Sequence, residues 1–120
     1  VVCAPGGRVG EVGKADLLEA GQTERASAYA MTAESYGFEL LYLEAGSGAT
    51  TPVSEELIHA ARNSCNLTLV VGGGIRDGEA ARKAVQAGAD WIITGNLTES
   101  FDDADELQRV LTEFISTMNS

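Results

Sequence analysis

The segment LTLVVGGGIRDGEAARKAVQAGADWIITGN, residues 67–96, decides the fold class because it predicts a strand, a helix and a second strand in succession. The apolar runs Leu67–Val71 and Trp91–Thr94 have the length of strands. Between them, Asp77 is placed to cap a helix that continues to Ala87 and is followed by glycine. Apolar strands that alternate with helices indicate a parallel sheet buried on both faces.

The same alternation extends over residues 1–120 as a single α/β domain. We expect strands at Val1–Ala4 and Glu39–Gly46, and helices at about Glu24–Tyr36 and Ser54–Asn63, with a loop between the first strand and the first helix. A last helix is expected to bury an apolar stripe formed by Leu107, Val110, Leu111, Phe114, Ile115 and Met118. Four strand and helix units fit either an open doubly wound sheet or a parallel (β/α)4 half of a TIM barrel. Because the chain opens inside an expected strand and without methionine, we also expect it to be a fragment of a longer protein.

Composition excludes several classes of function. The net charge of −10 repels nucleic acid and anionic membranes, so neither is expected as a partner. Two cysteines and one histidine are too few for a disulfide framework or a structural zinc site, and a reduced, cytoplasmic compartment is the expectation. Cys3 and Cys65 are expected in the core, His59 on a helix surface, and Trp91 packed against a helix.

Glycine-rich turns follow three of the expected strands: Ala45–Gly48, Gly72–Gly74 and Gly95–Asn96. In a parallel α/β fold these turns lie at the carboxyl edge of the sheet, where ligands bind. Glycine lets backbone N–H groups approach an anion closely, and the helix that follows directs its positive end to the same place. The three turns therefore predict a phosphate site that needs no lysine.

Glu44 is the ionisable residue that most suggests chemistry, because it lies late in an otherwise apolar strand. Alternation places Tyr42 on the same face as Glu44 and Leu43 on the opposite face. A carboxylate that anchors a loop and one that binds a ligand both fit this position. Ser47 similarly fits either a phosphate contact or a turn cap. For Arg76, a solvated side chain is favoured over one that faces an anion.

Several motifs resemble one known family. They are YLEAGSGATTPV at Tyr42–Val53, VVGGGIR at Val70–Arg76 and AGADWIITGN at Ala87–Asn96, with RVGEVGKADLL at residues 8–18 upstream. Together they are similar to geranylgeranylglyceryl phosphate synthases and their bacterial polyprenylglyceryl phosphate relatives, in the subgroup that carries YLEAGSGA. The resemblance covers nearly the whole chain and the C-terminal half of the family's TIM barrel.

This resemblance implies a prenyltransferase of lipid biosynthesis, in which the C3 hydroxyl of sn-glycerol 1-phosphate attacks the first carbon of geranylgeranyl or another polyprenyl diphosphate. Glu44 would help to deprotonate the attacking hydroxyl and Tyr42 would position it, as the catalytic residues. The implied glycerol-phosphate site consists of Tyr42, Leu43, Glu44, Ala45, Gly46, Ser47, Gly48, Gly73, Gly74, Gly95 and Asn96.

The resemblance also implies Mg²⁺, with ligands in the N-terminal half of the barrel and none in this chain. The isolated chain is therefore expected to be inactive. Since four parallel strands leave two open edges, we expect a homo-oligomer or pairing with the N-terminal half. Two alternatives remain: another phosphate-binding barrel enzyme of the sugar-phosphate isomerase type, or a half-barrel that binds phosphate without turnover.

Overall fold

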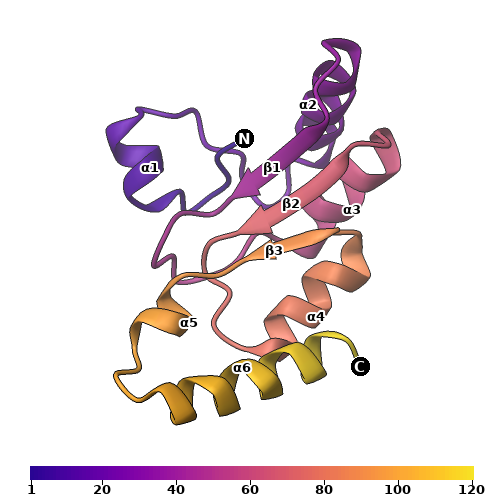
Figure 1. Ribbon diagram of the computed structural model, residues 1–120. Coiled ribbons are helices and arrows are strands. Elements are labelled where there is room, and N and C mark those ends of the chain that lie inside the picture. Colours follow the sequence, from indigo (N-terminus) through magenta and orange to yellow (C-terminus); the bar gives the residue numbers. More distant parts are fainter.

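The computed structural model describes residues 1–120 and contains a parallel three-stranded sheet in the order β1-β2-β3. The strands are β1 (Leu40–Glu44), β2 (Thr68–Gly72) and β3 (Trp91–Ile93). The helices are α1 (Gly7–Val12), α2 (Thr23–Ser35), α3 (Glu55–Ser64), α4 (Gly78–Ala87), α5 (Asn96–Glu99) and α6 (Ala104–Met118). Figure 1 shows α2, α3 and α4 in succession along one side of the sheet, with α6 beside α4. No helix combines the length and the apolar character that a membrane span requires.

Helix α4 begins and ends where the sequence predicts. The Asp77 side chain accepts a hydrogen bond of 2.8 Å from the Ala80 N–H, and Gly88 forms the C-cap. Ser54 caps α3 in the same way, through a bond from the Leu57 N–H. These caps mark where α3 and α4 begin, and the parallel order of the strands places the turns before both helices at one edge of the sheet.

The expected strand at Val1–Ala4 is wrong as a full strand. Val2 forms a single parallel bridge to Glu44, and the Cys3 N–H donates to the Glu44 carbonyl over 2.8 Å. The segment thus lies along the free edge of β1 and takes the place of a fourth strand. On its other side, Cys3 forms a parallel bridge to Leu18, and the Leu18 N–H donates to the Val2 carbonyl over 2.9 Å.

Two short helices were not predicted. Helix α1 lies in the expected loop, where glycine at positions 7 and 10 lowers helix propensity. Tertiary contact holds it instead: a Cβ on Gly7 would lie 3.1 Å from the Cα of Gly46, and Gly10 is buried. Helix α5 is a single turn, too short to leave a periodic pattern.

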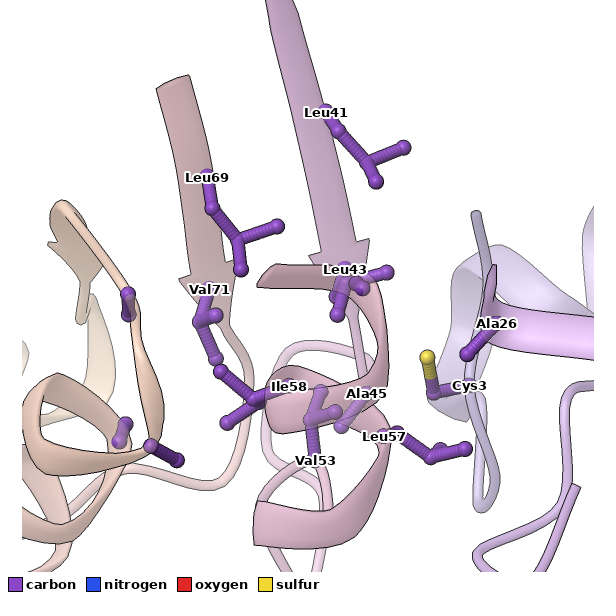
Figure 2. Close-up of a cluster of buried hydrophobic side chains, with 14 of the residues drawn as sticks. Cys3, Ala26, Leu41, Leu43, Ala45, Val53, Leu57, Ile58, Leu69 and Val71 are labelled. Atoms are coloured by element: carbon purple, nitrogen blue, oxygen red, sulfur yellow. The ribbon is translucent and has the colours of Figure 1, made fainter. Parts of the chain in front are cut away.

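The core lies between the sheet and the helices on one side of it, contrary to the expected burial of both faces. Leu41, Leu43, Leu69 and Val71 of β1 and β2 belong to one buried cluster with Ile58 of α3, and Figure 2 shows Ile58 beside Val71. Cys3 and Cys65 are buried free thiols and His59 is exposed, as expected, and burial raises the pKa of Cys3 to about 11.

The other face of the sheet is largely open, although Val70 at its centre is buried. Its side chains include Leu40, Trp91 and Ile93, which are 51%, 60% and 46% exposed. The expectation that Trp91 packs against a helix is therefore wrong, because its strand register directs it away from the helical layer. In α6 only Phe114 is buried, while Ile115 is 51% exposed, since α6 packs along α4 and not on the sheet.

Candidate functional site

The three glycine turns meet at the carboxyl edge of the sheet and line one pocket of about 140 Å³. The pocket lies on the open face, which carries the side chains of Tyr42 and Glu44. Parallel strands in register bring this about, because Glu44 pairs with Gly72, which pairs with Ile93. The lining residues are Tyr42, Glu44, Ser47, Gly48, Gly73, Gly74, Ile75, Arg76, Ile93, Thr94, Gly95 and Asn96.

The Glu44 carboxylate is held on both oxygens. The Tyr42 hydroxyl donates to Oε2, and the Gly46 N–H donates to Oε1 over 2.7 Å. Burial raises the pKa of Tyr42 above its ordinary value, and the bond to Glu44 adds to the shift, so the phenol stays a protonated donor at neutral pH. Each carboxylate oxygen can accept more than one hydrogen bond, so this arrangement orients Glu44 and leaves it able to accept another from a ligand.

Gly73 has no room for a side chain. A Cβ at this position would lie 2.6 Å from Glu44 Oε1 and 2.6 Å from the Gly46 nitrogen, and its φ of +84° is one that other residues rarely adopt. The glycine turn after β2 therefore packs directly against the carboxylate. This contact places Glu44 directly beside the Gly72–Gly74 turn, the two features that the sequence predicted for the site.

The remaining wall is built from Ser47, Gly48 and Asn96. Ser47 Oγ lies 3.5 Å from Asn96 Oδ1, which joins the turn after β1 to the start of α5. The backbone N–H groups of Gly48, Gly73 and Gly95 take no part in the chain's backbone hydrogen bonds. Free N–H groups and a serine hydroxyl are suitable donors to an anion such as phosphate.

Three expected site residues do not line the pocket. The side chain of Leu43 is fully buried in the core on the opposite face of β1, and Ala45 is likewise buried. Gly46 contributes through its N–H bond to Glu44 and through its close contact with Gly7. These positions belong to the continuous motif, but side chains alternate between the two faces of a strand, so not every residue of the motif can face the pocket.

Sequence reasoning undervalued Arg76 and missed Thr94. Arg76 lines the pocket, and its Nη2 donates to the Ala49 carbonyl over 3.0 Å. Its position directly after the GGGI turn was the sequence feature that could have indicated a place at the pocket. Thr94 Oγ1 donates to the Ile75 carbonyl over 2.9 Å, so this hydroxyl serves to tie β3 to the glycine turn.

Magnesium does not fit the residues of this chain. No group of three His, Cys, Asp or Glu side chains is close enough to hold a metal ion. The pocket offers one carboxylate, Glu44, and Tyr42 and Gly46 already contact its oxygens. Mg²⁺ requires near-octahedral oxygen ligation, usually with carboxylates and phosphates together.

A parallel β/α half-barrel with a glycine-rich pocket at the carboxyl edge of its strands defines the class, that of the phosphate-site TIM barrels. The chain belongs to the PcrB family, which it matches over residues 1–117. This confirms the resemblance seen in the YLEAGSGA motif and favours the half-barrel over an open doubly wound sheet.

The chain is similar to named relatives. It is 43% identical over 120 residues to the geranylgeranylglyceryl phosphate synthase of Thermoplasma volcanium, covering 100% of this chain and 46% of that protein. It is 51% identical over 104 residues to the enzyme of that name from Methanothrix thermoacetophila, covering 86% of this chain and 41% of that protein. The chain thus spans about half the length of the curated relatives it matches.

Solved structures agree with this likeness. The wild-type T. volcanium enzyme superposes with a TM-score of 0.89 at 43% identity, over 98% of this chain and 46% of that chain. The (S)-3-O-geranylgeranylglyceryl phosphate synthase of Thermoplasma acidophilum, in complex with sn-glycerol-1-phosphate, gives a TM-score of 0.90 at 38% identity with the same coverage. At these identities the likeness extends beyond the fold to the family.

Proposed function

We propose that this chain provides the glycerol-phosphate half of a prenyltransferase, which joins sn-glycerol 1-phosphate to geranylgeranyl or another polyprenyl diphosphate through an ether bond. The observation that carries the proposal is Glu44, held by Tyr42 and Gly46 in the same pocket as three glycine turns. The T. acidophilum relative, crystallised with sn-glycerol-1-phosphate, supports the choice of substrate.

In this proposal the phosphate binds to the N–H groups of the glycine turns and to Ser47, and the glycerol hydroxyls face Glu44. Glu44 accepts the proton of the C3 hydroxyl as its oxygen bonds to the first prenyl carbon, and diphosphate leaves with the bonding electrons. Tyr42 donates to the carboxylate and keeps it oriented towards the hydroxyl. An alcohol is a weak nucleophile, so a base at this position lowers the barrier. In this proposal the metal that neutralises the diphosphate is held by the half of the barrel that this chain does not span.

Binding of the two enantiomers tests this function directly. We expect the chain to bind sn-glycerol 1-phosphate at least about tenfold more tightly than sn-glycerol 3-phosphate, because only one enantiomer places its hydroxyls at Glu44 while its phosphate occupies the turns. A hydrogen bond to a charged group contributes about 1.5–3 kcal/mol, and about 1.4 kcal/mol is tenfold in affinity. Titration calorimetry measures both constants, with inorganic phosphate as the reference ligand.

The outcomes separate the proposed function from the alternatives. Equal binding of both enantiomers and of inorganic phosphate would favour a half-barrel that binds phosphate without selecting a glycerol. No binding of any of the three would remove the pocket from consideration as a phosphate site.

The proposed compartment is the cytoplasm, which the two free buried thiols support.

We further propose that the chain works as an assembly, either with a second copy or with an N-terminal half-barrel. The open face exposes Leu40, Trp91 and Ile93, and burying such side chains yields about 25 cal/mol per Å². The isolated chain of 12.5 kDa should therefore elute as a dimer or a larger species in size-exclusion chromatography with light scattering.

Two variants locate the contact surface. Trp91→Lys places a charge on the open face and should shift the chain towards the monomer. Ile115→Lys changes a side chain of comparable exposure on α6 and should leave the assembly intact. A stable wild-type monomer would contradict self-association through the open face, and prenyl transfer by the isolated chain with magnesium would contradict the expectation that this chain alone is inactive.

A further inference from the structure

Arg76 is one of two arginines, with Arg8, that form no ion pair. The other four, Arg25, Arg62, Arg82 and Arg109, each pair with a carboxylate within 3.9 Å. Arg76 pairs with none, although the chain carries 18 acidic residues. It is also the only cationic side chain that lines the glycine-rich pocket. Its position is thus not explained by an ion pair.

The guanidinium of Arg76 reaches from the turn after β2 to the turn after β1. Its Nη2 donates to the Ala49 carbonyl over 3.0 Å and lies 3.4 Å from the Gly48 carbonyl, 28 residues away in sequence. The turn that it contacts is closed by a bond of 3.1 Å from the Ala49 N–H to the Gly46 carbonyl. Ser47 and Gly48, which line the pocket, lie within this turn.

We propose that Arg76 is a positioning residue for the phosphate pocket, which fixes the Gly46–Ala49 turn so that Ser47 and Gly48 present their donors to the anion. The inference rests on the proposed function of this pocket. A lysine keeps the charge, but its compact ammonium lacks the planar fork that lets one guanidinium hold the turn in a fixed geometry. Because Arg76 is exposed, salt screens its charge, while its hydrogen bonds to the turn persist.

Arg76→Lys therefore separates positioning from charge. We expect it to weaken binding of sn-glycerol 1-phosphate by about five- to tenfold, the range for losing about one hydrogen bond's contribution. The loss should be the same at low and high salt. Arg82→Lys is the matched control, because Arg82 pairs with Glu79 on an exposed face of α4 and does not line the pocket.

A second measurement uses the free protein and reports on the turn itself. The Ala49 amide, which is buried and bonded to Gly46, should exchange with deuterium faster in Arg76→Lys than in wild type or in Arg82→Lys. Thermal unfolding of both variants checks that the fold is kept.

Each outcome decides the inference. Wild-type affinity in Arg76→Lys, or an unchanged Ala49 exchange rate, would overturn the positioning role while leaving the proposed function intact. A loss of affinity that appears in Arg76→Gln but not in Arg76→Lys would assign the effect to charge and also overturn it. A wild-type chain that binds neither glycerol phosphate nor inorganic phosphate would overturn both proposals together.

Discussion

Replacing Glu44 with glutamine should lower the rate of prenyl transfer by about 10²–10⁴, the usual contribution of a general base. Glutamine keeps the shape of the side chain but cannot take the proton of the attacking hydroxyl. It also keeps only one oxygen to accept bonds from Tyr42 and Gly46, so part of the orientation of the side chain is lost as well.

The rate is best measured in a fusion that places this chain behind the N-terminal part of the T. volcanium relative, which supplies the half that this chain does not span. Transfer of radiolabelled glycerol phosphate reports turnover. Glu39→Gln is the matched control, since Glu39 is exposed at the opposite end of β1. Undiminished turnover in Glu44→Gln would leave Glu44 with a structural role only.

Asn96→Asp should sharply weaken binding of sn-glycerol 1-phosphate. A new carboxylate about 4 Å from the phosphate costs on the order of 4 kcal/mol at an effective dielectric near 20, about a thousandfold in affinity, and less where water enters. Asn96 lines the pocket and its amide nitrogen would lie 3.6 Å from a Cβ on Gly48, so the charge would stand beside the turn that we propose receives the anion.

Titration calorimetry on the chain measures this loss, and added salt should reduce it because the repulsion is electrostatic. Asn63→Asp serves as the control: it makes the same chemical change on the exposed surface of α3, near the helix end opposite the pocket. Equal affinities for Asn96→Asp and wild type would remove Asn96 from the site.

Local patterns were sufficient to predict the parts of the site that depend on a single strand or helix. Alternation along β1 put Tyr42 and Glu44 on one face, and the cap at Asp77 fixed where α4 begins. The meeting of three glycine turns followed from parallel strands alone, since their carboxyl ends share an edge.

Long-range contacts were not predictable in this way. The residues of α1 favour a loop by propensity, and the helix forms where Gly7 packs on Gly46. Apolar character alone suggested a buried Trp91, yet register turns it to the open face. A sequence pattern records which residues are apolar but not which face of a sheet receives helices.

The amino-acid sequence by itself determined the α/β class, the strand edge that carries the candidate site and the presence of Glu44 among glycine turns. Only the tertiary structure decided that Gly73 packs against the Glu44 carboxylate and that Arg76 reaches the Ala49 carbonyl. The physical reason is the sequence separation over which each kind of interaction acts. Alternation and capping act over a few residues, whereas these contacts join segments that meet only after strand register and helix packing have set their distances.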